Sequence, residues 1–351
     1  MSRRALVTGG AGFIGSHVAD LFLENGYEVV IIDDLSNGDR ENLPARATFH
    51  EMDVGSAGAA AIVEQGRFDV ICHLAAQLDV RKSVADPMFD ARANIVASLN
   101  LLEAVKRSGG KTRFIFASTG GAIYGDGAPL PSPENVVKNP QSPYGIAKLS
   151  VEHYLAYFAN VHQLQTVALR FANVYGPRQG LHGEAGVVAI FSKRILAGQS
   201  LTIFGDGTQT RDYVFVGDVA RAHLLATTID LPKATDIDAR AFNLGTAVET
   251  DVNELARTLV ASAASPVPIE HAPPRAGEQH RSVVDWSKAR RVLGWEPRVA
   301  VHDGLARTYQ WFSERAAGAT RDAGASASGS DVRASASGRS SSAERAESAA
   351  P

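Results

Sequence analysis

Spaced glycines follow directly after the first apolar segment of the chain and open a segment of helical length. The stretch reads Ala5-Leu-Val-Thr-Gly9-Gly10-Ala-Gly12-Phe-Ile-Gly15. In such an arrangement Gly9 makes a tight turn, Gly12 lets backbone N–H groups approach a pyrophosphate at the helix N-terminus, and Gly15 lets the helix pack closely on the strand. The pattern is that of a dinucleotide-binding strand–turn–helix unit. Because glycine also serves ordinary turns, the interpretation needs a second feature.

An acidic residue at the end of the next apolar segment supplies that feature. The segment Glu28-Val-Val-Ile-Ile-Asp33 has the composition of a buried strand, and Asp33 lies 18 residues after Gly15. An acid near this distance binds both ribose hydroxyls of NAD, and its charge repels the 2′-phosphate of NADP. Asp33 ends the apolar run directly, with Asp34 as the alternative. The sequence therefore predicts a site for NAD.

Short apolar runs alternate with segments of helical length through the first half of the chain. The runs cover 5–7, 29–32, 70–74 and 114–116, and the helical segments cover 13–24, 94–107 and 144–158. This alternation predicts an α/β fold with a doubly wound parallel, Rossmann-type sheet over residues 1–174, to which later segments cross back. From about residue 175 the alternation loosens, which predicts a smaller C-terminal substrate-binding lobe over 175–315.

The last part of the chain differs in composition. In residues 316–351, 25 of the 36 positions are Ala, Ser or Gly. Such a segment buries too little apolar surface to offset the entropy lost on ordering, so it is predicted to be a disordered tail.

Charge and hydropathy exclude several classes of protein. Lys plus Arg is 35 and Asp plus Glu is 38, a net charge of −3, so there is no basic excess to predict a nucleic-acid partner. No apolar run reaches the roughly 18 residues of a membrane span. The N-terminal segment has no signal-peptide pattern, and a cytoplasmic location is expected. The single cysteine, Cys72, and the spacing of the ten histidines predict no metal site.

Tyr144 and Lys148 stand four residues apart at the start of a predicted helix, directly after Pro143. That spacing places both side chains on one helix face. Free tyrosine has a pKa of about 10 and is a poor base at neutral pH, but a nearby ammonium and a positive nicotinamide ring favour the phenolate. The buried run 114–116 leads to the hydroxyls of Ser118 and Thr119, at the edge where doubly wound sheets place their chemistry. The sequence predicts a reaction centre here.

Together these motifs resemble the extended short-chain dehydrogenase/reductase family, specifically its NAD-dependent sugar-nucleotide epimerases. The resemblance runs from Arg3 to about Glu314. It is carried by residues 8–17, 73–77, 118–125, 144–148, 169–178, 204–207, 211–214, 274–278 and 293–297. The resemblance implies that a UDP-hexose is epimerised at C4 through a transient 4-keto sugar with bound NAD, interconverting UDP-glucose and UDP-galactose. It also implies a homodimer formed through the helices at 94–107 and 144–158.

The resemblance also implies which residues meet the cofactor. They are Gly9, Gly12, Phe13, Ile14, Gly15, Asp33, Asp53, Val54, Leu74, Ala75, Ala76, Asn94, Tyr144 and Lys148. Tyr144 is implied to be the base, and Thr119 the hydroxyl that helps move the C4 proton. The family's best-studied members have Ser at that position. A gapless count back from Tyr124 reaches Gly120, which has no hydroxyl, so Ser118 remains the alternative to Thr119.

The resemblance further implies which residues bind the sugar nucleotide. They are Ser118, Thr119, Asn173, Val187, Arg211, Arg275, Glu278 and Ser282. The two arginines would neutralise the diphosphate, a role suited to bidentate guanidinium donors, and Glu278 would bind the uridine ribose. Ser282 matches a pocket-gating position that is small in members accepting N-acetylated sugars, which predicts some activity on UDP-N-acetylglucosamine.

Other reactions remain as alternatives. Epimerisation of UDP-glucuronate at C4, or of another nucleotide sugar, uses the same machinery. A 4,6-dehydratase or a decarboxylating relative needs an acid just after the strand-end hydroxyl, where this chain has Gly120-Gly121-Ala122. A redox-sensing NAD protein with a silent site would lack Tyr144 or Lys148. His73 and Cys72, at the end of a predicted buried strand, are expected to be packing or cofactor-wall residues.

Overall fold

A computed structural model describes residues 2–180, 186–274 and 280–330. Seven strands form one parallel sheet in the spatial order β10-β6-β5-β4-β1-β2-β3. Their bounds are β1 Arg3–Thr8, β2 Tyr27–Asp33, β3 Thr48–Glu51, β4 Val70–His73, β5 Arg113–Thr119, β6 Gln165–Phe171 and β10 Ala241–Leu244. The order reverses between β1 and β4, where doubly wound sheets bind their ligands beyond the carboxyl ends of the strands. The predicted sheet is confirmed.

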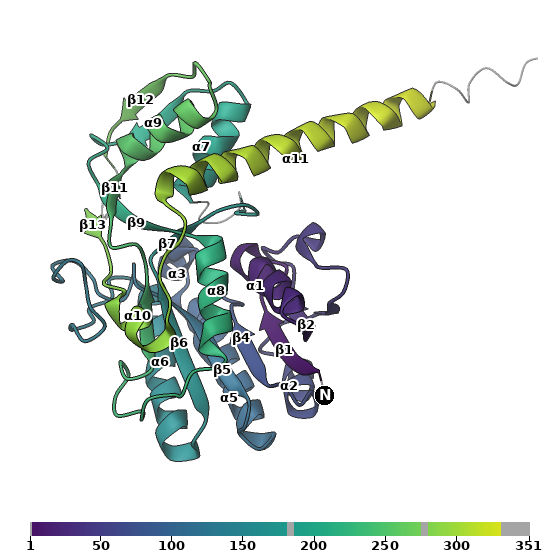
Figure 1. The fold of residues 1–351 in the computed structure, drawn as a ribbon, viewed down its shortest axis with the longest axis vertical. Helices are drawn as coiled ribbons and strands as arrows, with labels where there is room; N and C mark the ends of the chain where they lie inside the picture. Colours follow the sequence, from purple (N-terminus) through teal and green to yellow (C-terminus); the bar gives the residue numbers. More distant parts are fainter. Residues whose placement is uncertain (1, 181–185, 275–279, 331–351) are drawn as a thin grey trace, which may run out of the picture.

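Helices cover both faces of this sheet (Figure 1). One face carries α1 (Phe13–Glu24), α8 (Val216–Ala226) and α10 (Ser287–Leu293), and the other carries α2 (Ala57–Gln65), α5 (Ala97–Arg107) and α6 (Pro143–His162). Successive strand residues enter the two cores in turn, as Val7 packs on the α1 side and Leu6 on the α2 side. A strand buried on both faces needs consecutive apolar residues, which explains the short apolar runs of the sequence.

Helix α6 begins where the sequence marks a helix start. The Ser142 hydroxyl caps it by accepting a hydrogen bond from the N–H of Gly145 at 3.1 Å, and Pro143 fills the first turn, where no N–H is needed. The helix ends at His162, followed by Gln163 in the left-handed conformation with φ 58°. It therefore runs beyond the predicted end at residue 158.

The helix expected over 94–107 has an irregular start. Arg92–Val96 form a π-helical turn, η2, and α5 follows from Ala97. Two short helices precede it, α3 (Val80–Ala85) and α4 (Pro87–Ala91). The predicted helix is therefore present over Ala97–Arg107, and only its first three residues lie in the wider π-turn.

A smaller group of elements packs at one end of the sheet (Figure 1). One small sheet joins β7 (Asn173–Tyr175), β9 (Thr210–Phe215), β11 (Glu249–Asp251) and β13 (Arg281–Ser282), and a second pairs β8 (Leu201–Phe204) with β12 (Ile269–Ala272). Helices α7 (Val187–Leu196) and α9 (Val252–Ser262) complete a separate apolar core that includes Phe191, Leu201 and Leu255. Between these elements, α8, β10 and α10 return to the large sheet.

The last helix, α11 (Val301–Ser330), packs its first turns on the smaller lobe and then extends away from it (Figure 1). Leu305 belongs to the core of that lobe. The helix continues past residue 316 to Ser330, in the segment for which the sequence predicts a disordered tail. Alanine is abundant there and has the highest helix propensity of all residues. Residues 331–351 lie outside the described residues.

Over the ranges that the structure describes, no helix combines the length and the apolar character needed to cross a membrane.

Candidate active site

The turn between β1 and α1 requires glycine at two positions. Gly9 has φ +70°, in the left-handed region, and its N–H donates to the carbonyl of Ile32 at 2.8 Å. A Cβ added to Gly15 would lie 2.1 Å from the carbonyl oxygen of Gly9. Helix α1 starts after Gly12 without a side-chain cap. The first backbone N–H groups of α1 are therefore placed to receive a phosphate.

A cavity of about 670 Å³ opens beside this turn, at the carboxyl ends of the central strands. Its volume suits a bound small molecule. The predicted cofactor residues that line it are Gly9, Gly12, Phe13, Ile14, Gly15, Asp33, Asp53, Val54, Leu74, Ala75, Ala76, Tyr144 and Lys148. The fold thus brings residues from five separate segments to one place, while the role of each remains a prediction.

Asn94 is the exception among the predicted cofactor residues. It is buried in the π-turn η2, and it does not line the cavity. Its Oδ1 accepts from the N–H of Gln77 at 3.0 Å, and its Nδ2 donates to the carbonyl of Gln77 at 2.9 Å. Because Gln77 itself lines the cavity, Asn94 supports the wall from behind.

Asp33 stands at the end of β2 with its carboxylate turned toward the glycine turn. Its Oδ2 accepts from the N–H of Ala11 at 3.0 Å and its Oδ1 from the N–H of Leu35 at 2.8 Å. Burial raises the pKa of Asp33, and these backbone hydrogen bonds oppose that shift. The alternative, Asp34, also lines the cavity, but its Oδ1 accepts from the N–H of Ser36 at 2.9 Å.

His73, at the end of β4, is buried behind the cavity. Its Nδ1 lies 2.7 Å from Thr8 Oγ1, and its Nε2 lies 2.9 Å from Ser98 Oγ. Since the Ser98 hydroxyl donates to the carbonyl of Asn94 at 2.6 Å, Nε2–H donates to Ser98 and Nδ1 accepts from Thr8. Burial lowers the pKa of His73 to about 3, which keeps the ring neutral. Thr8 Oγ1 also accepts from the N–H of Leu74 at 3.2 Å, so this chain of bonds holds the cavity wall.

Tyr144 and Lys148 lie together on the first turns of α6. The Lys148 Nζ is 5.7 Å from the centroid of the Tyr144 ring and donates to the carbonyl of Ala117, at the end of β5, at 2.9 Å. Burial lowers the pKa of Lys148 to about 8, while the charges of Asp90 and Glu152 raise it. A positive charge thus stands beside the phenol that is predicted to act as base.

The two hydroxyls at the end of β5 have different hydrogen-bond partners. Ser118 lines the cavity, and its hydroxyl donates to Glu152 Oε1 at 2.5 Å. Thr119 Oγ1 accepts from the N–H of Ala122 at 3.1 Å, and in the described structure its proton has no protein acceptor. The Ser118 proton is therefore held by a protein carboxylate, whereas that of Thr119 is not.

Three of the predicted substrate residues meet around Gly121. An ideal Cβ at Gly121 would lie 3.8 Å from Thr119 Oγ1, 3.8 Å from Asn173 Oδ1 and 3.9 Å from Ser282 Oγ. Asn173 comes from β7 and Ser282 from β13, so the large sheet and the smaller lobe both contribute. A small polar space results, next to the predicted catalytic hydroxyl.

Two further predicted substrate residues, Arg211 and Val187, lie on the smaller lobe. Arg211, on β9, is the register partner of Ser282, and its Nη1 donates to the carbonyl of Thr210 at 2.8 Å. Val187 is the first residue of α7. Arg275 and Glu278 lie outside the described residues.

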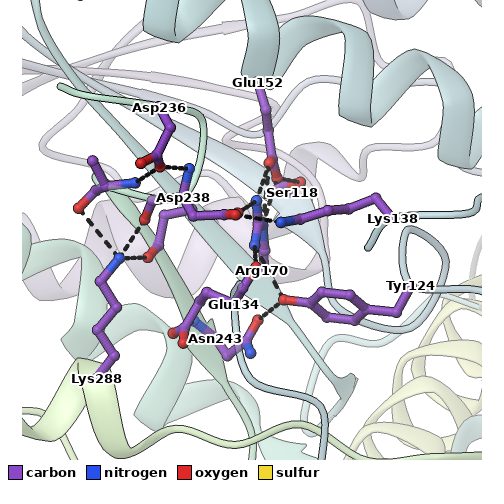
Figure 2. A network of polar contacts seen from close by, with 12 residues as sticks. Ser118, Tyr124, Glu134, Lys138, Glu152, Arg170, Asp236, Asp238, Asn243 and Lys288 are labelled. Carbon is purple, nitrogen blue, oxygen red and sulfur yellow. Dashed lines mark hydrogen bonds and ion pairs between the residues drawn. The ribbon is translucent and has the colours of Figure 1, made fainter. Parts of the chain in front are cut away.

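Sequence reasoning missed a buried ion pair next to this site. Glu152 on α6 and Arg170 on β6 are hydrogen-bonded to each other and lie among the polar groups drawn in Figure 2. Two signals could have found it. Glu152 follows Lys148 by one helical turn, and Arg170 interrupts the apolar run at 167–171.

No cluster of three or more His, Cys, Asp or Glu side chains that could hold a metal ion is present among the described residues.

A doubly wound sheet with a glycine-rich turn at its reversal point, and a Tyr–Lys pair on the neighbouring helix, defines a dinucleotide-dependent α/β enzyme. The comparisons with known proteins narrow this class. The model of the NAD dependent epimerase/dehydratase family matches residues 5–245, and the chain belongs to that family. The enzyme is therefore NAD-dependent, and its glycine turn and Asp33 carboxylate suit this cofactor.

The chain is similar to several UDP-glucose 4-epimerases along nearly their whole length. The one from Mycolicibacterium smegmatis is 43% identical, over 89% of this chain and 99% of that protein. The crystal structure of the Thermotoga maritima enzyme with UDP-glucose is 46% identical and superposes with a TM-score of 0.83, over 89% of this chain and 99% of that one. The Thermus thermophilus enzyme in complex with NAD is 40% identical with a TM-score of 0.79, over 88% and 99%.

Proposed function

We propose that this protein is a UDP-hexose 4-epimerase that interconverts UDP-glucose and UDP-galactose. The observation that carries the proposal is the buried Lys148 ammonium beside Tyr144 on the wall of the dinucleotide cavity. A phenol next to such a cation is suited to take and return the proton of a sugar hydroxyl. The likeness to named UDP-glucose 4-epimerases supports the same substrate.

Each side chain then has a defined task. Tyr144, as phenolate, removes the proton of the C4 hydroxyl and returns it once the keto sugar has turned. Lys148 stabilises the phenolate by its charge. Thr119 passes the proton, because the Ser118 proton is already held by Glu152. NAD, when bound, supplies the acceptor and then the donor of the C4 hydride.

The smaller lobe is proposed to hold the nucleotide while the sugar turns. Arg211 provides a guanidinium for the diphosphate, and Asn173 reaches the phosphate from β7. Arg275 and Glu278 keep the roles that the resemblance implies, at the second arginine and the uridine ribose. Binding energy placed on the UDP, away from the reacting carbon, lets the ring rotate without release.

The absence of an acid beside the catalytic hydroxyl argues against a dehydratase. Gly120 and Gly121 occupy the positions where a leaving-group acid would be needed. At Gly120 an added Cβ would lie 2.8 Å from Val284 Cγ1, so no larger side chain fits there without displacement. Epimerisation of UDP-glucuronate at C4 uses the same groups and is the alternative.

A panel of UDP-, dTDP- and GDP-sugars tests the proposal, with products identified by NMR and no reductant added. Interconversion of UDP-galactose and UDP-glucose as the fastest reaction supports it. UDP-glucuronate as the preferred substrate would favour the alternative, and loss of water from the sugar would overturn the assignment to epimerisation.

We further propose that the enzyme acts in the cytoplasm as a homodimer. Helix α6 presents a stripe of exposed apolar side chains along one face, Ile146, Tyr154, Tyr157 and Val161. The neighbouring segment adds Met88 and Val96, which are also exposed. A contiguous apolar surface of this kind is typical of a protein–protein interface, and a second copy of α6 would complement it.

A further inference from the structure

A buried arginine organises the polar groups behind the reaction centre (Figure 2). Arg170 is fully buried on β6. Its Nη2 donates to Glu152 Oε2 at 2.6 Å and to Asp238 Oδ1 at 2.7 Å, and its Nε donates to Glu152 at 3.0 Å. Its Nη1 donates to the Tyr124 hydroxyl and to the carbonyl of Glu134, both at 3.1 Å. All five donors of the guanidinium group thus face partners inside the protein.

Glu152 connects this arginine to the active site. Its side chain is only 1% exposed, and its Oε1 accepts a hydrogen bond from the Ser118 hydroxyl at 2.5 Å. Glu152 also follows Lys148 by four residues on α6, so the two side chains lie on the same helix face. One carboxylate therefore contacts the strand-end hydroxyl and acts electrostatically on the buried ammonium.

We propose that Glu152, held by Arg170, is a positioning residue for the reaction centre: it retains the Ser118 proton and provides the counter-charge that keeps Lys148 an ammonium ion. Thr119 is then the strand-end hydroxyl left to serve the sugar. This inference rests on the proposed function for the role of Thr119, but the charge on Lys148 can be measured without substrate.

The charges around Lys148 come from several elements. Asp90 of α4 and Glu152 of α6 both raise the pKa of its ammonium, which burial lowers. Tyr144 lies beside it on α6, and His73 of β4 faces it as a neutral ring. Loss of the Glu152 charge removes one of the two carboxylates and leaves the Arg170 cation less compensated. Both changes lower the pKa of Lys148.

The pKa of Lys148 can be measured directly in the full-length protein by NMR titration of isotope-labelled lysine side chains. The variant Lys148→Met assigns the signal. Glu152→Gln is expected to lower the Lys148 pKa by about one unit. Glu134→Gln is the matched control, because Glu134 is a buried carboxylate of the same cluster whose Oε1 accepts from the N–H of Asn243 at 2.8 Å. It contacts neither Ser118 nor Lys148. An unchanged pKa in Glu152→Gln, or an equal shift in Glu134→Gln, overturns the proposal.

The hydroxyl assignment is tested by kinetics, which also covers the case that Glu152→Gln does not fold. Ser118→Ala leaves the Glu152–Arg170 pair intact and is expected to lower kcat less than tenfold. Thr119→Ala is expected to lower kcat by about a hundredfold or more with little change in KM, and Thr119→Ser to restore most of it. A larger loss of kcat in Ser118→Ala than in Thr119→Ala overturns the proposal. A native protein inactive on every sugar nucleotide would instead reject the proposed function, and the lysine titration would still stand.

Discussion

At Lys148 two electrostatic effects act in opposite directions. Burial lowers the pKa of its ammonium to about 8, and the carboxylates of Asp90 and Glu152 keep it from falling further. The residue is therefore charged at neutral pH, yet it loses its proton in mildly alkaline solution. A lysine in this state can stabilise the Tyr144 phenolate and still respond to its surroundings.

The pH dependence of the rate follows from this pKa. Because the protonated form of Lys148 is the one that favours the phenolate, kcat should decrease as the pH rises through about 8. A profile of kcat against pH at saturating UDP-galactose measures it. A rate that stays constant well above that pH would show that the charge on Lys148 does not matter to the reaction.

Ser282 is predicted to set the size of the space beside the predicted catalytic hydroxyl. It is buried, and its Oγ lies 3.9 Å from the position of a Cβ on Gly121. Ser282→Tyr should reduce the ratio of UDP-N-acetylglucosamine to UDP-galactose activity by about tenfold or more, because the ring would fill room needed by the acetamido group. Steady-state rates on both substrates give the ratio, and an unchanged ratio would contradict the role of Ser282.

At the scale of elements, the join between β1 and α1 tolerates no side chain at Gly15. Gly15→Ala would place a Cβ 2.1 Å from the carbonyl oxygen of Gly9, so the helix start must move away from the turn. The variant should be purified with little or no bound NAD and should unfold at a lower temperature. Extraction of nucleotide and thermal unfolding measure both effects.

Gly58→Ala in α2 is the matched control for Gly15→Ala. Its added Cβ would meet nothing closer than 3.5 Å, at Met52 Sδ. It should keep its NAD and gain about 0.5 to 1 kcal/mol of stability, as alanine does in a helix. Equal NAD content in the two variants would contradict the account of the turn.

The elements that could be predicted are those whose signal is local. Gly9, Gly15 and Asp33 are separated by short stretches of chain, and the geometry of a strand–turn–helix unit fixes what each must do. The Tyr144–Lys148 spacing is likewise set within one helix. These segments lie where the sequence indicated, around one cavity.

Features that depend on distant partners could not be predicted. The bond between Glu152 and Arg170 joins a helix to a strand, and the direction of the Ser118 hydroxyl depends on that pair. Asn94 is buried in a π-turn, and the spacing of apolar residues in the sequence does not indicate such a turn. Residues 316–330 contain no large apolar side chain, but their alanine content is compatible with the helix found there.

At the scale of the whole molecule, the large sheet and the smaller lobe meet at the reaction centre. Thr119 ends β5 of the large sheet, whereas Asn173 on β7 and Ser282 on β13 belong to the smaller lobe. The large sheet can thus bind the dinucleotide, and the smaller lobe can bind the sugar nucleotide. Within the large-sheet part, the buried cluster around Arg170 joins residues from β6, α6 and the loop before β10 (Figure 2).

The proposed dimer is testable on the exposed face of α6. Tyr157 and Val161 are 48% and 58% exposed and lie one turn apart. The double variant Tyr157→Glu/Val161→Glu should shift the protein from dimer to monomer in light scattering, because two charged side chains would be buried at the interface. Val248→Glu, at an exposed apolar residue of the smaller lobe, should leave the mass unchanged. A native protein that is monomeric at all concentrations would contradict the proposal.

The central claim is that one hydrogen leaves C4 of the sugar and returns to the same carbon while Tyr144 carries the proton. UDP-galactose labelled with deuterium at C4 tests it most directly, with the product followed by NMR. We expect the native enzyme to form UDP-glucose that keeps its deuterium at C4, and Tyr144→Phe to slow this reaction by about a hundredfold or more. Deuterium lost to the solvent, or a Tyr144→Phe variant of native speed, would contradict it.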